Sequence, residues 1–465
     1  MTETPTAAVI EYASPSSDQA ALERRVVRKI MWRIIPVMCF LYLFNYLDRV
    51  NIGYAKLQMP QTLPWLTASV FGFAAGIFFV GYFLFEVPSN LIMQKVGARL
   101  WMARIMVSWG LISAAMAFIS EPWHFHGLRL LLGFAEAGFF PGMLLYITYW
   151  IPTQQRANAT ALFMTSTALS GVIGGPIAEA LMQVHGLGLV GWQWMFLLEG
   201  VPSVLLGISI IFVLSDSPQQ ARWLSAEEKR VLAARLEADH AAMPHDTGHH
   251  LSDAMRDPRV WVLCLLYGLL IWGFYVINFW TPSLIESTHP TGVPVGWLSA
   301  IPFLSSVIIM SLVGMWTDRT GRRRHAVIIF ATLSAVGFAV AALTTHIHST
   351  IVMVTSLSLA AAAIWSTLGP FWALPSRFLR SSAVAGGLAL INAVGNLLGG
   401  TIGNGLMGKL KDATGTYEPA LWITAGISLG GALLAWQLPN LRIKDRFDRS
   451  PENAVTPPTA PHQAE

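Results

Sequence analysis

The sequence predicts an all-α membrane protein in which twelve transmembrane helices form two bundles of six, with both termini on the cytoplasmic side. The first observation is composition: of 465 residues, 54% are hydrophobic and only 12% are charged. The second is that apolar stretches of about 20 residues, the length of one helical crossing, recur along the whole chain. A bilayer is therefore favoured over water as the solvent for most of this sequence.

The twelve expected crossings account for most of the chain, and short loops separate them. They are expected near residues 34–56, 66–93, 100–119, 125–150, 157–182, 192–214, 258–285, 295–316, 325–345, 349–374, 383–407 and 420–438.

The third observation is the distribution of positive charge. Most of the 30 Lys and Arg residues fall in tails and loops on the side of the N terminus, whereas the opposite side has only Lys56, Lys409 and Lys411. Cytoplasmic loops of membrane proteins collect Lys and Arg. The net charge of +4 is thus explained by topology, and we expect no nucleic-acid partner. We expect a multi-pass protein of the bacterial inner membrane.

One long polar interruption divides the apolar segments six and six. The predicted parts are a tail (1–33), a first bundle (34–214), a cytoplasmic linker (215–257), a second bundle (258–438) and a disordered tail (439–465). In the linker, Ser225 followed by Glu228 indicates a capped amphipathic helix. Three histidines, His245, His249 and His250, lack the Cys or carboxylate pattern of a metal site, so we expect neither a metal nor another cofactor.

The loop after the eighth predicted helix carries a specific motif. Residues 314–323 read G-M-W-T-D-R-T-G-R-R, which matches the G-x-x-x-D-R-x-G-R-R loop signature of the major facilitator superfamily. The resemblance implies the twelve-helix fold and a conformational latch made by Asp318, Arg319 and Arg322, since an acid at a helix end can bind Arg side chains and backbone dipoles. Retention of the loop by its positive charge is the alternative interpretation. In the first half, Gln94 occupies the acidic position, so that latch is expected to be weaker or differently made.

Further motifs resemble the anion:cation symporter family within this superfamily, and among its members the bacterial tartrate, phthalate and 4-hydroxyphenylacetate permeases. They are N-Y-L-D-R-V-N at residues 45–51, G-Y-F-L-F-E-V-P-S-N at 81–90, R-L-L-L-G-F-A-E-A-G-F-F-P-G at 129–142 and A-L-I-N-A-V-G-N at 389–396.

Charged residues inside predicted helices are the candidate functional residues, because ionisable groups in hydrocarbon are costly and are normally retained for use. Arg129 and Glu136 are two turns apart, so they should share one helix face about 10 Å apart and line a groove. Arg129 is then expected to meet Asp48 or an entering anion. The guanidinium groups of Arg49 and Arg129 suit capture of a substrate carboxylate or pairing with these acids.

The resemblance adds expected roles for individual residues. Family carboxylates that match Asp48 and Glu136 are protonation sites, which implies proton coupling here, because the proton affinity of a buried carboxylate changes when a charged partner arrives or leaves. A static lattice of salt bridges between helices is the alternative. Four more residues stand at positions that resemble substrate-contacting ones, and ordinary helix packing is the alternative for each: Tyr46, Tyr82, Trp372 and Asn392.

We therefore expect a secondary active transporter, which takes up a small organic anion together with protons and uses the proton gradient as its energy source. The anion would be tartrate, a sugar acid or an aromatic carboxylate, and the transporter is expected to act as a monomer. The alternatives are an antiporter or uniporter of the same fold and a transporter-like nutrient sensor. No membrane-enzyme motif is present, so no enzymatic activity is expected. The roles of Glu86 and Glu199 stay open.

Overall fold

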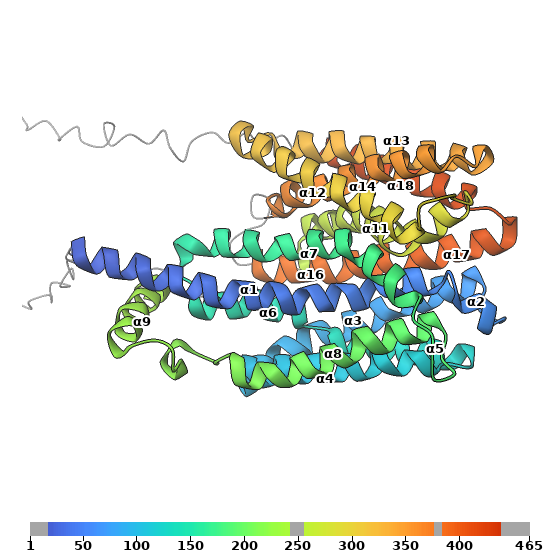
Figure 1. Ribbon diagram of the computed structural model, residues 1–465. Coiled ribbons are helices and arrows are strands. Elements are labelled where there is room, and N and C mark those ends of the chain that lie inside the picture. Colours follow the sequence, from blue (N-terminus) through green and yellow to red (C-terminus); the bar gives the residue numbers. More distant parts are fainter. Residues whose placement is uncertain (1–16, 242–254, 376–383, 439–465) are drawn as a thin grey trace, which may run out of the picture.

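The computed structural model describes residues 17–241, 255–375 and 384–438, and long helices make up most of these ranges (Figure 1). Within them, eleven helices are long and apolar enough to cross a membrane. A twelfth crossing consists of α16, a π-helical turn and α17, which follow one another without a break from residue 384 to residue 414. The predicted twelve-helix fold is confirmed.

The N-terminal half contains six of these crossings, and the fourth is made of two helices. Its long helices are α1 (Ser17–Ala55), α3 (Ala68–Val96), α4 (Ala98–Ala115), α5 (Pro122–Glu136), α6 (Phe139–Trp150), α7 (Thr153–Met182) and α8 (Gly191–Val213). The short helix α2 (Met59–Thr62) lies at one end of this bundle (Figure 1), and the 3-10 turn η1 (Met116–Phe118) directly follows α4. Helix α1 begins 17 residues before its predicted start, within the segment expected to be a tail.

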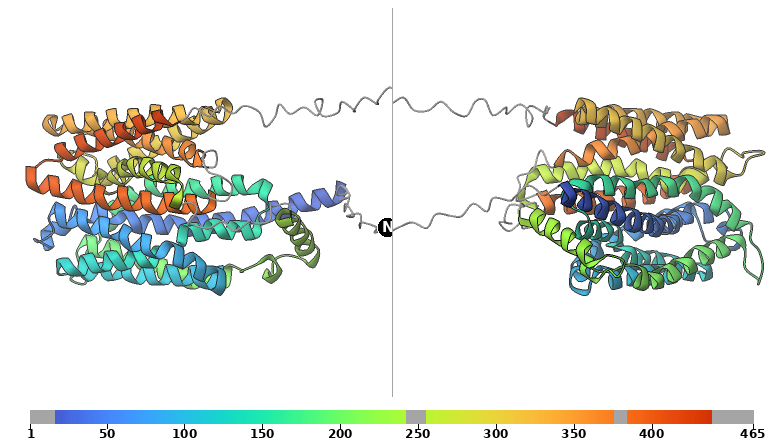
Figure 2. Two further views of the ribbon diagram at one scale, coloured as in Figure 1. Left: turned by 180° about the vertical axis from the view of Figure 1, so that it is seen from behind. Right: turned by 60° about the vertical axis from the view of Figure 1, so that its left-hand side comes forward.

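The C-terminal half repeats this plan. Its helices are α11 (Pro258–Glu286), α12 (Val295–Thr320), α13 (Arg323–Ile347), α14 (Thr350–Trp372), α16 (Val384–Asn396), the π-helix η4 (Leu397–Ile402), α17 (Gly403–Thr414) and α18 (Glu418–Gln437). Within the halves, α4 packs on α8 and α13 packs on α14 and α18. The halves meet where α7 packs on α12 and α3 packs on α17, and the view from behind shows α17 beside the N-terminal helices (Figure 2).

The fourth crossing is broken directly after Glu136. Gly138 adopts a left-handed conformation with φ of 86°, which glycine tolerates and other residues disfavour. A side chain at this position would also collide with Ser89 of α3. Helix α5 therefore ends at Glu136 and α6 starts at Phe139, which places the Glu136 carboxylate at an irregular point in the middle of the molecule.

At the end of the molecule that carries α2, the two halves are in direct contact. A Cβ atom on Gly175 of α7 would collide with the backbone of Gly296 in α12, and the reverse is also true. The Glu179 carboxylate accepts a hydrogen bond from the Gly296 N–H (3.2 Å). Small residues thus allow the backbones of the two halves to approach closely here, as at other tight helix crossings in membranes.

A second contact at the α2 end joins α17 to the start of α3. The Asp412 carboxylate accepts hydrogen bonds from the backbone N–H groups of Ala68 (3.0 Å) and Ser69 (2.7 Å). These N–H groups belong to the first turn of α3 and have no partner within the helix. One half of the protein therefore caps a helix of the other.

The opposite end carries α9 (Ala226–Ala241), the helix of the predicted linker. Its predicted capping box is confirmed: the Glu228 N–H donates to Ser225 Oγ (3.2 Å) and the Ser225 N–H donates to the Glu228 carboxylate (2.8 Å). Lys29 of α1 donates to the same carboxylate at 2.8 Å, and this hydrogen bond lowers the pKa of Glu228. Helix α9 is thereby bound to α1.

Some of the sequence predictions fall outside the described residues and stay predictions. These are the tail 439–465 and the histidines of the linker: His245, His249 and His250.

Candidate functional site

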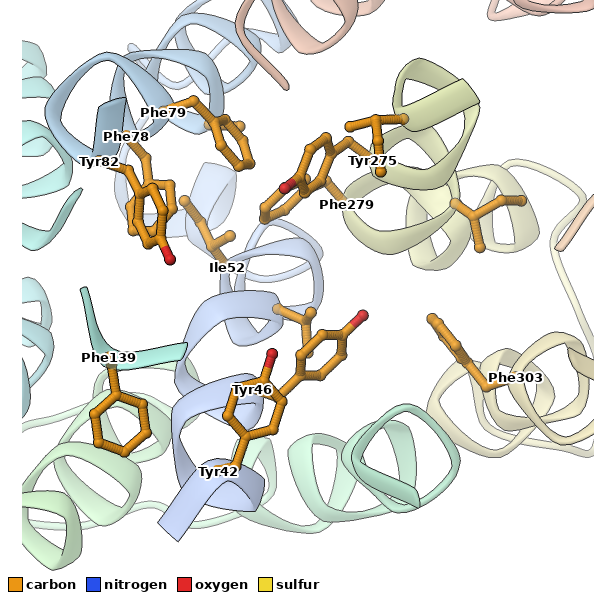
Figure 3. Close-up of a cluster of buried hydrophobic side chains, with 14 of the residues drawn as sticks. Tyr42, Tyr46, Ile52, Phe78, Phe79, Tyr82, Phe139, Tyr275, Phe279 and Phe303 are labelled. Atoms are coloured by element: carbon orange, nitrogen blue, oxygen red, sulfur yellow. The ribbon is translucent and has the colours of Figure 1, made fainter. Parts of the chain in front are cut away.

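A cavity of about 480 Å³ lies between the two halves. Its wall combines aromatic side chains with a few polar groups, which is the usual composition of a site for a small molecule. In Figure 3, Tyr42 and Tyr46 of α1 and Tyr82 of α3 lie on one side of the interface between the halves, and Tyr275 of α11 lies on the other side. The lining also includes Gly314, close to the α9 end of α12, so the cavity extends from the centre toward that end.

Five of the six residues predicted to contact substrate line this cavity. Tyr46, Arg49 and Tyr82 come from the N-terminal half, whereas Trp372 and Asn392 come from the C-terminal half. Helices far apart in the sequence therefore bring these residues to one space, as the motifs predicted.

Arg129 is the exception, and the expectation that it lines the groove is corrected. The Arg129 side chain is only 1% exposed. Its Nε–H donates to the carbonyl oxygen of Ala74 at 3.2 Å, and its guanidinium carbon lies 4.8 Å from the centre of the Phe78 ring. The Phe78 ring of α3 contacts both Arg129 and Arg49, and of the two arginines only Arg49 lines the cavity. Spacing along α5 placed Arg129 and Glu136 on one face, but it could not show that α3 covers the part of that face near Arg129.

The partner of Glu136 is Arg49. The Arg49 guanidinium forms an ion pair with the Glu136 carboxylate through Nη2, and its Nε donates to the same oxygen at 2.7 Å. Asn45, one turn earlier on α1, donates to this oxygen as well (2.8 Å). The Glu136 side chain is only 2% exposed, while Arg49 reaches the cavity wall. A substrate carboxylate in the cavity would meet Arg49 before it could meet Glu136.

Asp48 lies in a separate polar cluster on the other side of α1. Its carboxylate accepts hydrogen bonds from the Trp109 indole (2.7 Å), the Ser113 hydroxyl (2.8 Å) and the Ser203 hydroxyl (2.9 Å). The predicted meeting of Arg129 with Asp48 is not observed, because these donors from α4 and α8 already surround the carboxylate. Asp48 does not line the cavity, so it is held within the N-terminal bundle.

Two further carboxylates have defined partners. Glu199 accepts a hydrogen bond from Asn51 at 2.7 Å, one turn along α1 from Asp48. Glu86 of α3 accepts a hydrogen bond from the Asn392 amide at 2.8 Å, which links the two halves across the cavity. Tyr46 makes a second such link by donating to the Asn278 amide oxygen. Asn278 is a cavity residue whose only sequence signal was an amide in an apolar segment.

The predicted latch has a different partner in this structure. Asp318 pairs at 3.7 Å with Arg323, and its side chain is 75% exposed, whereas no ion pair of Asp318 with Arg319 or Arg322 occurs among the described residues. In the first half, Asp216 after α8 supplies the negative charge that Gln94 lacks: it forms an ion pair with the Arg99 guanidinium at 3.8 Å and accepts a hydrogen bond from the Arg99 backbone N–H at 2.8 Å. No sequence pattern points to Asp216, because it is distant from the motif.

The fold and this site define a class of protein. Two six-helix bundles enclose a central cavity, close it at one end by direct contact and leave it to extend toward the other. This is the arrangement of secondary transporters, whose substrate lies near the midplane between two repeats that rock against each other.

Comparison with known proteins identifies the family. The pattern of the Major Facilitator Superfamily matches residues 38–403 and 284–461, and the chain belongs to this superfamily. A putative tartrate transporter of Agrobacterium vitis is 45% identical over 89% of this chain and 91% of its own length. The putative metabolite transport protein NicT of Pseudomonas putida is also 45% identical, over 88% of this chain and 94% of its own length.

These relatives agree with the anion:cation symporter group that the motifs indicated. Among solved structures, a D-xylose–proton symporter superposes with a TM-score of 0.70 at 16% identity, over 87% of this chain and 97% of the other, which supports the fold. The protein is therefore a multi-pass membrane transporter and not an enzyme.

Proposed function

We propose that this protein takes up a small organic anion together with protons across the bacterial inner membrane, by alternating access of the central cavity. The substrate class is tartrate, a sugar acid or an aromatic carboxylate. The relatives named as tartrate transporters support a small carboxylate, and the cavity supplies one guanidinium, amides and indole rings to bind carboxylate, hydroxyl groups or a ring. Nothing in this mechanism requires a cofactor, since the proton gradient drives uptake.

The observation that carries this proposal is the pair of Arg49 with Glu136 at the cavity wall. A substrate carboxylate that binds Arg49 competes with Glu136 for the same N–H groups. The displaced Glu136 would then be a buried charge without its cation, which costs several kcal/mol unless a proton neutralises it. Binding of the anion and binding of a proton are therefore linked at one arginine, and this linkage is what a symporter needs.

Asp48 is proposed as the second proton site. Its carboxylate is 3% exposed and has three neutral donors but no cation within salt-bridge distance among the described residues. Because Asp48 and Arg49 are adjacent on α1, a movement of α1 that opens or closes the cavity would also alter the shell of Asp48. Proton uptake at Asp48 would then accompany the conformational change rather than substrate binding.

The orientation follows from the distribution of charge. We place the α9 end, where Lys29 and the basic start of α13 at Arg323 lie, in the cytoplasm together with both termini. The cavity then extends toward the cytoplasm, and the contacts of Gly175 and Asp412 close the periplasmic side. Each half contributes to a single cavity within one chain, so a monomer suffices for transport.

The test is uptake into proteoliposomes of radiolabelled tartrate, galactonate, phthalate and 4-hydroxyphenylacetate, with and without an inward proton gradient. Accumulation of one anion that depends on the gradient supports symport and names the substrate class. Exchange of internal for external anion without accumulation would instead support an antiporter. Absence of flux for every anion would reject this substrate class.

An exporter is the second candidate, and one relative favours it. A quinolone resistance transporter of Acinetobacter baumannii is 38% identical over 89% of this chain and 95% of its own length. The aromatic wall formed by Tyr267, Trp365 and Trp372 would also suit a flat aromatic carboxylate. Resistance of cells that overproduce the protein, measured in the same variants as uptake, separates the two directions.

A further inference from the structure

A second groove lies between α1 and α7, away from the central cavity. It has a volume of about 550 Å³ and runs along the α9 end of both helices. Arg24, Arg28 and Trp32 of α1 line one side, one helical turn apart from each other, and Gln155, Asn158 and Leu162 of α7 line the other. The groove thus has a charged and polar mouth and an apolar interior.

The groove faces away from the central cavity. Leu162 lies two residues before Met164 of α7, and Met164 lines the central cavity. Two residues turn an α-helix by about 200°, so the two side chains lie on opposite flanks of α7. The Leu162 side chain is 44% exposed although it is apolar. In a protein that spans a membrane, an exposed apolar flank of this kind contacts lipid chains.

The height of the groove matches the headgroup layer. The predicted hydrocarbon segment of α1 begins near residue 34, so Arg28 lies about 9 Å beyond it along the helix, and Trp32 lies near the boundary. Trp32 is 77% exposed, and exposed tryptophans mark membrane interfaces. The guanidinium groups are therefore at the level of lipid phosphates while the interior of the groove is at the level of acyl chains.

The two arginines have no carboxylate partner among the described residues. The neighbouring acids are already engaged: Glu23 of α1 pairs with Arg235, and the Asp239 carboxylate accepts a hydrogen bond from the Thr153 N–H. Two free, exposed positive charges above an apolar groove fit a ligand with an anionic head and apolar tails. Basic pockets between transmembrane helices on the cytoplasmic side are known binding sites for anionic lipid headgroups.

We propose that this groove binds an anionic phospholipid, whose phosphate contacts Arg24 and Arg28 while Gln155 and Asn158 hydrogen-bond the headgroup and an acyl chain lies along Leu162. This assignment concerns a site separate from the transport cavity, and it does not depend on the transported substrate.

The test measures lipid binding directly. Purified protein in neutral detergent is titrated with phosphatidylglycerol, and in parallel with phosphatidylethanolamine of the same acyl chains, and bound lipid is counted by native mass spectrometry. We expect one phosphatidylglycerol to bind more tightly than phosphatidylethanolamine. The double variant Arg24→Ala/Arg28→Ala should bind phosphatidylglycerol roughly thirtyfold more weakly, as expected for loss of two basic residues at an anionic surface.

Two further variants distinguish this site from general surface charge. Arg25→Ala/Arg230→Ala removes the same number of positive charges from exposed positions outside the groove. This variant should still bind one phosphatidylglycerol with unchanged affinity. Leu162→Trp fills the groove, leaves both arginines in place and should also weaken binding. Three results would overturn the proposal. Both double variants could lose phosphatidylglycerol affinity equally, Leu162→Trp could bind phosphatidylglycerol as tightly as the unmodified protein, or millimolar inorganic phosphate could displace the bound lipid. Thermal unfolding of every variant checks that it is folded.

Discussion

Replacement of Glu136 by Gln separates anion binding from proton coupling. Gln keeps the size of the side chain and one oxygen acceptor, so Asn45 can still donate to it, but the negative charge next to Arg49 is lost. A hydrogen bond to a charged group contributes about 1.5–3 kcal/mol, compared with about 0.5–1.5 kcal/mol for a neutral one. Arg49 is therefore held less strongly, by about 1.5 kcal/mol, and is more available to a substrate carboxylate.

Two opposite effects follow from this single change. The substrate anion should bind the Glu136→Gln variant roughly tenfold more tightly at neutral pH, because it no longer competes with a carboxylate for Arg49. Uptake driven by a gradient of two pH units, which for one proton per anion in an electroneutral cycle can reach about 100-fold accumulation, should fall to simple equilibration. Exchange of labelled for unlabelled substrate should persist.

The assay combines three measurements on the same proteoliposomes: equilibrium binding, counterflow exchange and gradient-driven uptake. Glu199→Gln is the matched control, because Glu199 is similarly buried at 4% exposure but does not line the cavity; it should retain anion affinity. Normal accumulation in Glu136→Gln, or weaker binding than in the unmodified protein, would refute the linkage through Arg49.

Three further predictions test other parts of the structure. Arg49→Ala should abolish saturable anion binding, and undiminished affinity in a binding titration would remove Arg49 from the substrate site. Asp412→Ala removes the cap that joins the halves, at a cost of about 2 kcal/mol. Spin-label distances across the α2 end should therefore report a larger population of the conformation that is open at this end. Asp257→Ala, which removes a cap within one half, should leave these distances unchanged. The hydrogen bond from Lys29 lowers the pKa of Glu228. Docking of α9 on α1 should therefore be complete above the usual Glu pKa near 4.3 and be lost as the pH falls below it. The prediction is contradicted if residues 226–241 stay equally protected from proteolysis down to pH 3.

The fold could be predicted because its causes are local. Apolar stretches of sufficient length specify crossings, and the predicted Ser225–Glu228 capping box formed where its residues required. The break of the fourth crossing at Gly138 was not predicted, because glycine within an apolar segment is also compatible with an unbroken helix. Glycine is required at this turn because a Cβ atom would collide with Ser89 of another helix, and no local pattern shows that contact.

The site could be predicted only in part, for a related reason. Periodicity identified Arg129 and Glu136 as residues on one face of a helix, but the choice of partner depends on which neighbouring helix approaches. In the structure α1 brings Arg49 to Glu136, and α3 places the Phe78 ring against Arg129. Asn278, which links the two halves, and Asp216, which joins two helices of the first half, gave little signal, because their partners are distant in the sequence.

The contact between Gly175 and Gly296 also bears on how such a protein can change during evolution. Because neither residue touches the cavity, a single added methyl group at either position would act as a wedge that raises the free energy of one conformation and leaves the chemistry of the binding site intact. Turnover rate and the apparent affinity on each side of the membrane could then drift independently of substrate choice. Mutations at these two glycines could thus change the conformational equilibrium of the transporter during evolution while its substrate specificity stays the same.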